Sequence, residues 1–242
     1  MNNIQHIHEL LRQAVLQKTS STAPFFKTGP GEYAAHDRFL GIPNPALRQI
    51  AKTIKTVSLS EIEQLLASAY NEERLLALFL LVNCYTKASE AERSELYCFY
   101  LAHTIQINNW NLVDASAHLI VGHYVYAKDK DILITLARSS TLWERRIAIV
   151  ATWYFIRKGD LEWTFILSDI LLTDTHDLIH KAVGWMLREA GKRNKQKLVD
   201  FLRKRAHCMP RTMLRYALEK FSPEEQQTFK NLSISKIQRK SS

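Results

Sequence analysis

The sequence predicts an all-α fold built from repeated helix pairs, and three observations carry this prediction. Nearly every apolar segment of the 242 residues has helical spacing. The segments recur in pairs, with successive pairs 32 to 40 residues apart. Glycine and proline number only seven and six, which favours helices with short connections over a β-rich fold. The period is that of an α-solenoid of HEAT-like (armadillo-type) repeats, and a non-repetitive helical bundle is the alternative.

The first elements are a helix, a loop and a second helix. Residues 3–17 have apolar positions at helical spacing and predict the first helix. A flexible loop is expected at about 19–38, because glycines at 29 and 31 flank a proline. Asn44 then suits an N-cap, and Pro45 suits the first position of the helix that follows.

Later helix starts are marked by capping boxes, in which Ser or Thr precedes Glu by three residues. The four boxes are Ser58-x-x-Glu61, Ser89-x-x-Glu92, Thr141-x-x-Glu144 and Ser222-x-x-Glu225. Helical periodicity covers residues 72–86, 109–126, 130–138, 142–157, 160–172, 177–191, 195–207 and 211–221. A polar tail at about 231–242 is expected to fray. We therefore expect about six helix pairs in a single domain over residues 1–242.

One matched position in successive repeats carries a charged residue. The steps along this column are 40, 32, 35 and 34 residues. Its members are Arg74, Asp114, Arg146, Lys181 and Arg215. Stacked repeats place equivalent helices on the concave face, so we expect the column to line a basic groove.

Asp114 is the single acid in this column, and it follows Trp110 by one helical turn. The four cations suit a polyanion, whereas a carboxylate among them repels one. One interpretation is an ion pair within the column. The other is chemistry on a substrate that becomes cationic during the reaction.

Further tryptophans share the register of the column. Trp185 lies four residues after Lys181, and Arg188 continues that helix face. Trp143 and Arg146 are three residues apart at the start of another helix. We expect these tryptophans to converge with Trp110 and the cations on one surface.

Two other tryptophans and a histidine pair receive a structural interpretation. Trp153 and Trp163 lack the register of the column, and we interpret them as core residues. His176 and His180 have the spacing of metal ligands but no evident third ligand. No metal and no cofactor are therefore expected.

The net charge of +9 is concentrated at one end of the chain. Residues 181–242 contain 16 Lys and Arg against 5 Asp and Glu, a net charge of +11. The first 180 residues contain 17 and 19, a net charge of −2. Such a concentration of positive charge points to nucleic acid or an anionic surface as the partner. A basic protein without an anionic partner is the alternative.

Composition also excludes several classes of protein. Three cysteines without a CxxC pair argue against a disulfide framework or a structural zinc site, and fit a reducing cytosol. The amphipathic N-terminus differs from a secretory signal, and no run of 18 apolar residues occurs. We expect a cytoplasmic protein, and one that associates with the nucleoid where its anionic partner is DNA. A monomer with no membrane and no obligate protein partner is also expected.

Three segments carry a resemblance to a known family. At Trp110–Asp114, Trp143–Arg146 and the sequence KAVGWMLRE of residues 181–189, the chain resembles the AlkD-type alkylpurine DNA glycosylases. These are HEAT-like-repeat DNA alkylation repair proteins. The sequence RFLGIPNPALR of residues 38–48 is also similar, and the resemblance extends from about residue 25 to residue 220.

The resemblance implies a monofunctional, metal-independent glycosylase that removes cationic N3- or N7-alkylated purines from double-stranded DNA. It implies that Trp110 and Trp185 contact the deoxyribose and that Asp114 is the catalytic carboxylate. It also implies that Arg146 holds the backbone beside the lesion, and that the modified base is not drawn into a pocket. The further DNA-binding candidates are Lys181, Arg188, Arg74, Arg215 and Lys192.

The loop at residues 25–37 departs from better-studied relatives, which have a helix with a DNA-touching aromatic there. Phe26 and Tyr33 are the candidates for that part. Two other functions remain open. One is a non-catalytic binder of distorted or branched DNA, which gives no role to Asp114. The other is a HEAT-type protein-interaction scaffold, which predicts little affinity for phosphates.

Overall fold

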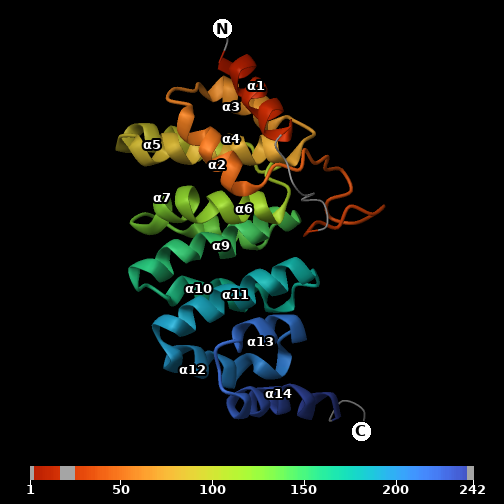
Figure 1. Cartoon of the computed structure of the whole chain (residues 1–242). Coiled ribbons are helices and arrows are strands. Elements are labelled where there is room, and N and C mark those ends of the chain that lie inside the picture. The colour runs from red at the N-terminus through yellow and green to blue at the C-terminus, as the bar shows by residue number, and fades with distance from the viewer. Residues whose placement is uncertain (1–2, 17–24, 239–242) are drawn as a thin grey trace. The chain divides into compact units, whose positions relative to one another are not determined.

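The computed structural model of the chain describes residues 3–16 and 25–238, with residues 233–238 described by their backbone alone. The fold of these residues is all-α and built from helical repeats, as the sequence predicted (Figure 1). Their one isolated extended pairing is a parallel bridge between Arg38 and Tyr70. The chain divides into two compact units, Met1–Ser116 and Ala117–Ser242. A single continuous domain over residues 1–242 stays a prediction.

The first unit is organised around one buried helix. Its helices are α1 (Asn3–Leu16), α2 (Asn44–Thr53), α3 (Leu59–Leu66), α4 (Asn71–Lys87), α5 (Glu90–Ala102) and α6 (Trp110–Ala117), which ends at the boundary with the second unit. Helices α2, α3 and α5 pack against α4. All side chains from Leu75 to Leu81 are buried, because α4 is apolar around its whole circumference rather than along one stripe.

The second unit consists of paired helices in two rows. Its elements are the π-helix η2 (His118–Gly122), α7 (His123–Tyr126), α8 (Asp131–Ala137), α9 (Leu142–Lys158), α10 (Glu162–Ile170), the 3₁₀ turn η3 (Leu171–Thr173), α11 (Asp177–Arg193), α12 (Lys195–Arg205), the 3₁₀ turn η4 (Ala206–Cys208), α13 (Arg211–Ala217) and α14 (Pro223–Gln238). Helix α9 packs on α11, and α11 packs on α13. Helices α8 and α10 pack on α9, and α12 packs on α11.

The predicted repeat register is visible within this second unit. Arg146, Lys181 and Arg215 are each the fifth residue of α9, α11 and α13, which are neighbours in one row. Gly184 allows the close approach of α11 and α13, because a Cβ there would lie 2.5 Å from the carbonyl oxygen of Met213. The repeat is therefore a packing unit as well as a sequence pattern.

Three of the four predicted capping boxes are present. Ser58 with Glu61 and Ser89 with Glu92 form both reciprocal hydrogen bonds, and so do Ser222 and Glu225. The box at Thr141 was predicted wrongly. Its side chain makes no capping hydrogen bond, and the Glu144 carboxylate accepts a hydrogen bond from the Ser139 hydroxyl at 2.5 Å.

Three boundaries differ from the sequence prediction. The N-cap of α2 is Pro43, so Asn44 is the first helical residue rather than the cap. The helix predicted over 109–126 is divided by the π-helix η2. Helix α14 runs to Gln238 and includes much of the tail that was expected to fray. Residues 239–242, residues 19–24 of the predicted loop and the last residue of the helix predicted over 3–17 lie outside the described part.

Candidate functional site

Trp110 and Asp114 lie in the first two turns of α6 and are both partly exposed. Asn109 immediately precedes this helix. Its backbone carbonyl accepts hydrogen bonds from the Leu112 and Val113 amides at 3.2 Å, and its side-chain oxygen accepts one from the Trp110 amide at 2.7 Å. Because residues four apart share a helix face, the indole and the carboxylate are neighbours on one side of α6.

The indole of Trp110 belongs to an aromatic stack. Phe26 stacks on Trp110 with ring centroids 5.1 Å apart and planes at 20°. The other neighbour of Phe26 is Phe39, at 4.6 Å and 30°. The Tyr33 hydroxyl instead accepts a hydrogen bond from the Lys27 amide at 3.2 Å. Phe26, one of the two loop aromatics singled out in the sequence, therefore stacks directly on Trp110.

A cavity of about 260 Å³ opens beside this stack within the first unit. Its lining includes Phe25, Phe26, Phe39, Trp110, Asn71 and Asn111. Phe25 lies at the edge of this cavity and is 75% exposed. Aromatic walls with a few amide groups suit a flat or apolar group rather than a strongly hydrated ion.

The charge of Asp114 acts on a buried tyrosine. The Tyr100 hydroxyl shares a 3.0 Å hydrogen bond with Ser116, which also donates to the Leu112 carbonyl at 2.7 Å. Burial raises the pKa of Tyr100 far above its usual range, the hydrogen bond with Ser116 opposes this rise, and the negative charge of Asp114 adds to it. Tyr100 is therefore a neutral neighbour of the Asp114 carboxylate.

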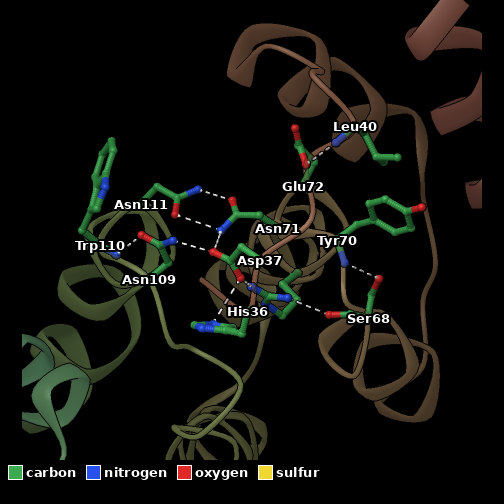
Figure 2. Close-up of polar contacts among 11 residues, drawn as sticks. His36, Asp37, Leu40, Ser68, Tyr70, Asn71, Glu72, Asn109, Trp110 and Asn111 are labelled. Atoms are coloured by element: carbon green, nitrogen blue, oxygen red, sulfur yellow. Dashed lines mark hydrogen bonds and ion pairs between the residues drawn. The ribbon is translucent and has the colours of Figure 1, made fainter. Parts of the chain in front are cut away.

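Arg74 lies in the interior of the first unit. It is 4% exposed and forms an ion pair with Asp37, whose side chain is fully buried. Its guanidinium also donates to the Ser68 carbonyl at 2.7 Å. Figure 2 shows this polar cluster around Asp37. A DNA contact by Arg74 stays a prediction, and this placement gives the residue a structural role in the first unit.

Trp185 is partly exposed in the second unit and belongs to another aromatic cluster. Trp153 meets it edge-on, with ring centroids 5.0 Å apart. Trp153 also contacts His118 at 4.5 Å and the Arg157 guanidinium at 4.6 Å. Trp153 and Trp163 are partly buried, so both lie at the edge of the core rather than fully inside it.

Trp143 and Arg146 lie deeper than the sequence suggested. Trp143 is 8% exposed and Arg146 is 5% exposed. The Arg146 guanidinium donates to the Leu178 carbonyl at 2.6 Å and so joins α9 to the start of α11. Trp143 is therefore part of the core rather than of a binding surface. A DNA contact by Arg146 stays a prediction.

Lys181 and Arg215 are accessible members of the column. Lys181 pairs with Asp177 at 2.7 Å, and both side chains are partly or largely exposed. The hydrogen bond from Lys181 is the main cause that lowers the pKa of Asp177. Arg215 is exposed, with its guanidinium 5.3 Å from the Tyr216 ring centroid. Such exposed pairs are weak, so phosphates can replace the carboxylate as partner.

Arg188 and Lys192 form a charged cluster at the end of α11. Arg188 pairs with Glu219 and, at 3.3 Å, with Glu189. The hydrogen bond from Arg188 is the main cause that lowers the pKa of Glu219. Lys192, which is 44% exposed, also pairs with Glu189, at 2.8 Å. Of the predicted DNA-binding residues, Lys192, Lys181 and Arg215 are the most accessible.

The described residues were also searched for a metal site and for membrane-spanning helices. Among them, no group of three or more His, Cys, Asp or Glu side chains is placed to hold a metal ion. None of their helices is both long and apolar enough to cross a membrane.

Comparisons with known proteins identify the family of the chain. The DNA alkylation repair enzyme family matches residues 7–221. A solved structure described as a predicted DNA alkylation repair enzyme from Enterococcus faecalis is similar, with a TM-score of 0.62 and 19% sequence identity. The similarity covers 82% of this chain and 98% of that one, and supports the shared fold. No curated protein matches the sequence.

Proposed function

The chain belongs to the DNA alkylation repair enzyme family, and from this premise we propose that it is a DNA glycosylase. The family supports a role in the repair of alkylated DNA. The finer proposal is hydrolysis of the N-glycosidic bond of cationic N3- or N7-alkylated purines in double-stranded DNA. The observation that carries it is the pair of Trp110 and Asp114, both partly exposed and one turn apart on α6.

The chemistry needs a negative group beside the sugar. Alkylation at N3 or N7 makes the purine cationic and therefore a good leaving group. When the bond from C1′ to the base breaks, its electron pair neutralises the base and leaves an oxocarbenium-like sugar. Water then adds to C1′ and loses a proton, which gives a free base and an abasic site. A preorganised carboxylate stabilises the developing positive charge and accepts that proton.

Asp114 fits this role, and Trp110 fits the binding of the sugar. A preorganised charge of this kind contributes about 10²–10³ in rate, by analogy with oxyanion-hole donors. The face of an indole attracts a cation by about 0.5–2 kcal/mol. Phe26 covers part of the Trp110 ring system and limits its motion. In this proposal the sugar approaches the part of the indole that Phe26 leaves accessible.

Cations of the second unit supply phosphate contacts in this proposal. Lys181, Lys192 and Arg215 are accessible, and Arg188 adds a partly exposed guanidinium. Phosphate contacts position a duplex without reading its sequence, which suits an enzyme that must find rare lesions in any context. Trp185 is proposed as a second sugar contact.

The decisive experiment measures release of 7-methylguanine and 3-methyladenine from methylated duplex DNA under single-turnover conditions. We expect the rate to fall by about 10²–10³ in Asp114→Asn, by analogy with the loss of one preorganised group. DNA affinity should hold or rise, because a charge that repels phosphates is removed. Asp131→Asn, which removes an exposed charge from α8, is the matched control and should keep the wild-type rate.

Two results would contradict the proposal. Unchanged excision in Asp114→Asn would exclude this carboxylate from the chemistry. Binding of methylated duplex without any base release by the wild-type protein would favour the non-catalytic binder of distorted or branched DNA.

A further inference from the structure

We propose that Asp37 and Asn109 form a positioning pair, which fixes the start of α6 and thereby the direction of Trp110. The inference rests on the proposed glycosylase function. Neither residue carries a motif in the sequence, and neither is a candidate for contact with DNA. Asp37 is the last residue of the loop at residues 25–37, and Asn109 immediately precedes α6, so 72 positions separate them in the chain.

Asp37 is the centre of a buried network. Its side chain is fully buried, and one carboxylate oxygen faces Arg74 and, at 3.3 Å, the Nε2 of His36. The other oxygen accepts hydrogen bonds from the side-chain amides of Asn109 at 2.6 Å and Asn71 at 3.0 Å. Figure 2 shows these contacts converging on the carboxylate from separate segments of the first unit.

The charge of Asp37 determines which way the Asn109 amide points. A carboxylate accepts hydrogen bonds and cannot donate them, so only the NH₂ end of the amide can face it. The amide oxygen of Asn109 is then directed at the Trp110 backbone, whose N–H it accepts at 2.7 Å. Asn109 is 0% exposed, so water does not compete for these groups. Asp37 thereby orients the Asn109 side chain, and Asn109 in turn holds the first backbone amide of α6.

A second connection holds the other side of Trp110. The side-chain amides of Asn111 and Asn71 bond reciprocally, at 2.7 Å and 3.4 Å. Asn71 is itself bound to Asp37. The residues immediately before and after Trp110 are therefore both held to the same cluster. With its backbone fixed on both sides, Trp110 directs its indole onto Phe26.

Stability alone does not explain this arrangement. Buried ionic networks are weak contributors to stability, because desolvation offsets most of the attraction between the charges. Here the carboxylate and the side-chain amides are hydrogen-bonded, and only the buried Nε of Arg74 has no hydrogen-bond partner within the cluster. Hydrogen bonds in the buried interior favour one arrangement of their partners. Such a network adjoining Trp110 and Asp114 suits a site whose groups must be held before the substrate arrives. Small displacements of reacting groups are costly in rate.

The central test is Asn109→Ala, which removes the link to Trp110 and leaves the ion pair of Asp37 with Arg74 in place. We expect the single-turnover excision rate to fall by about 10- to 100-fold with little change in DNA affinity. His36→Ala is the matched control, since the His36 side chain contacts the same carboxylate but is 47% exposed. Ile62→Val in α3 controls for a general loss of stability. Both controls should keep the wild-type rate.

A readout independent of catalysis follows the indole itself. The protein is labelled with 5-fluorotryptophan, and the ¹⁹F resonance of Trp110 is assigned with Trp110→Phe. This resonance should shift or broaden in Asn109→Ala and remain in place in His36→Ala and Ile62→Val. The double variant Asp37→Asn with Asn109→Ala should excise no more slowly than Asp37→Asn alone. Both substitutions break the same connection, which runs from Asp37 through Asn109 to Trp110.

The two proposals fail in different ways. An unchanged Trp110 resonance in Asn109→Ala would overturn the positioning role, whatever the enzyme does. A shifted resonance with an unchanged excision rate would also overturn it, since the new direction of the indole would not matter to the reaction. If the wild-type protein releases no base, the glycosylase proposal fails, and the catalytic role of the pair fails with it.

Discussion

At the scale of single residues, cations at the matched position of different repeats have different roles. Arg74 and Arg146 are buried and bind a carboxylate or a carbonyl, whereas Lys181 and Arg215 are accessible. The sequence motif fixes which helix face each cation occupies. The protein groups that lie near each cation then decide whether it holds helices together or is available to a ligand.

This difference predicts the effect of Arg74→Ala. The substitution leaves the fully buried Asp37 carboxylate without its ionic partner, and breaking such a pair costs about 3–5 kcal/mol of unfolding free energy. Urea unfolding followed by circular dichroism measures the loss. Arg215→Ala is the comparison, because an exposed cation should change stability by less than about 0.5 kcal/mol. A loss below about 1 kcal/mol in Arg74→Ala would show that the pair is not desolvated in solution.

At the scale of helices, the repeat depends on close approach between neighbours in one row. Gly184 lies where α11 meets α13, and a Cβ there would be 2.5 Å from both the Met213 carbonyl oxygen and the Tyr216 Cβ. Backbone cannot move aside as a side-chain end can. The glycine of KAVGWMLRE is therefore required by packing, although the sequence alone suggests only a helix with an unfavourable residue.

Gly184→Ala should therefore destabilise the second unit, although alanine is the better helix former. Overpacking of this kind costs about 1–3 kcal/mol. The matched variant is Gly191→Ala in the same helix, whose Cβ would meet mainly the flexible end of the Leu198 side chain. Thermal unfolding should show a clear fall in Tm for the first variant and a smaller fall or a gain for the second. Equal effects would mean that α11 and α13 are further apart in solution.

At the scale of the whole molecule, the charge distribution is the feature most directly linked to DNA. Residues 181–242 hold a net charge of +11, against −2 for the rest of the chain. Some of these cations are already paired with carboxylates, as Lys192 is with Glu189. Affinity for a duplex therefore reflects the exchange of weak surface pairs for phosphates together with the release of counterions.

Binding of the full chain to duplex DNA should weaken steeply with salt. If Lys181, Lys192, Arg188 and Arg215 each neutralise one phosphate, the log–log slope should lie near −3.6, at about −0.9 per contact. The double variant Lys181→Gln with Lys192→Gln should reduce the slope by about 2. Fluorescence anisotropy between about 50 and 200 mM salt measures both. A slope near zero would favour the protein-interaction scaffold instead.

The sequence by itself determined the helices, their repetition and the candidate pair on α6. These features depend on interactions between residues a few positions apart, such as the 3.6-residue period and the Ser-to-Glu capping boxes at 58 and 89. The family also became recognisable at this level, because the motif of residues 181–189 is local. The pair of Trp110 and Asp114 was found for the same reason.

Only the tertiary structure decided the surroundings of that pair. The contacts of Asp37 join residues 37 and 72 positions away, to Arg74 and Asn109, and no periodic pattern predicts such partners. Phe26 and Trp110, whose rings stack, are still further apart in the sequence. Burial changes the role of a charged or aromatic residue, and it depends on which segments of the folded chain come together. The sequence therefore indicated the candidate groups of the site, while the fold decided what holds them.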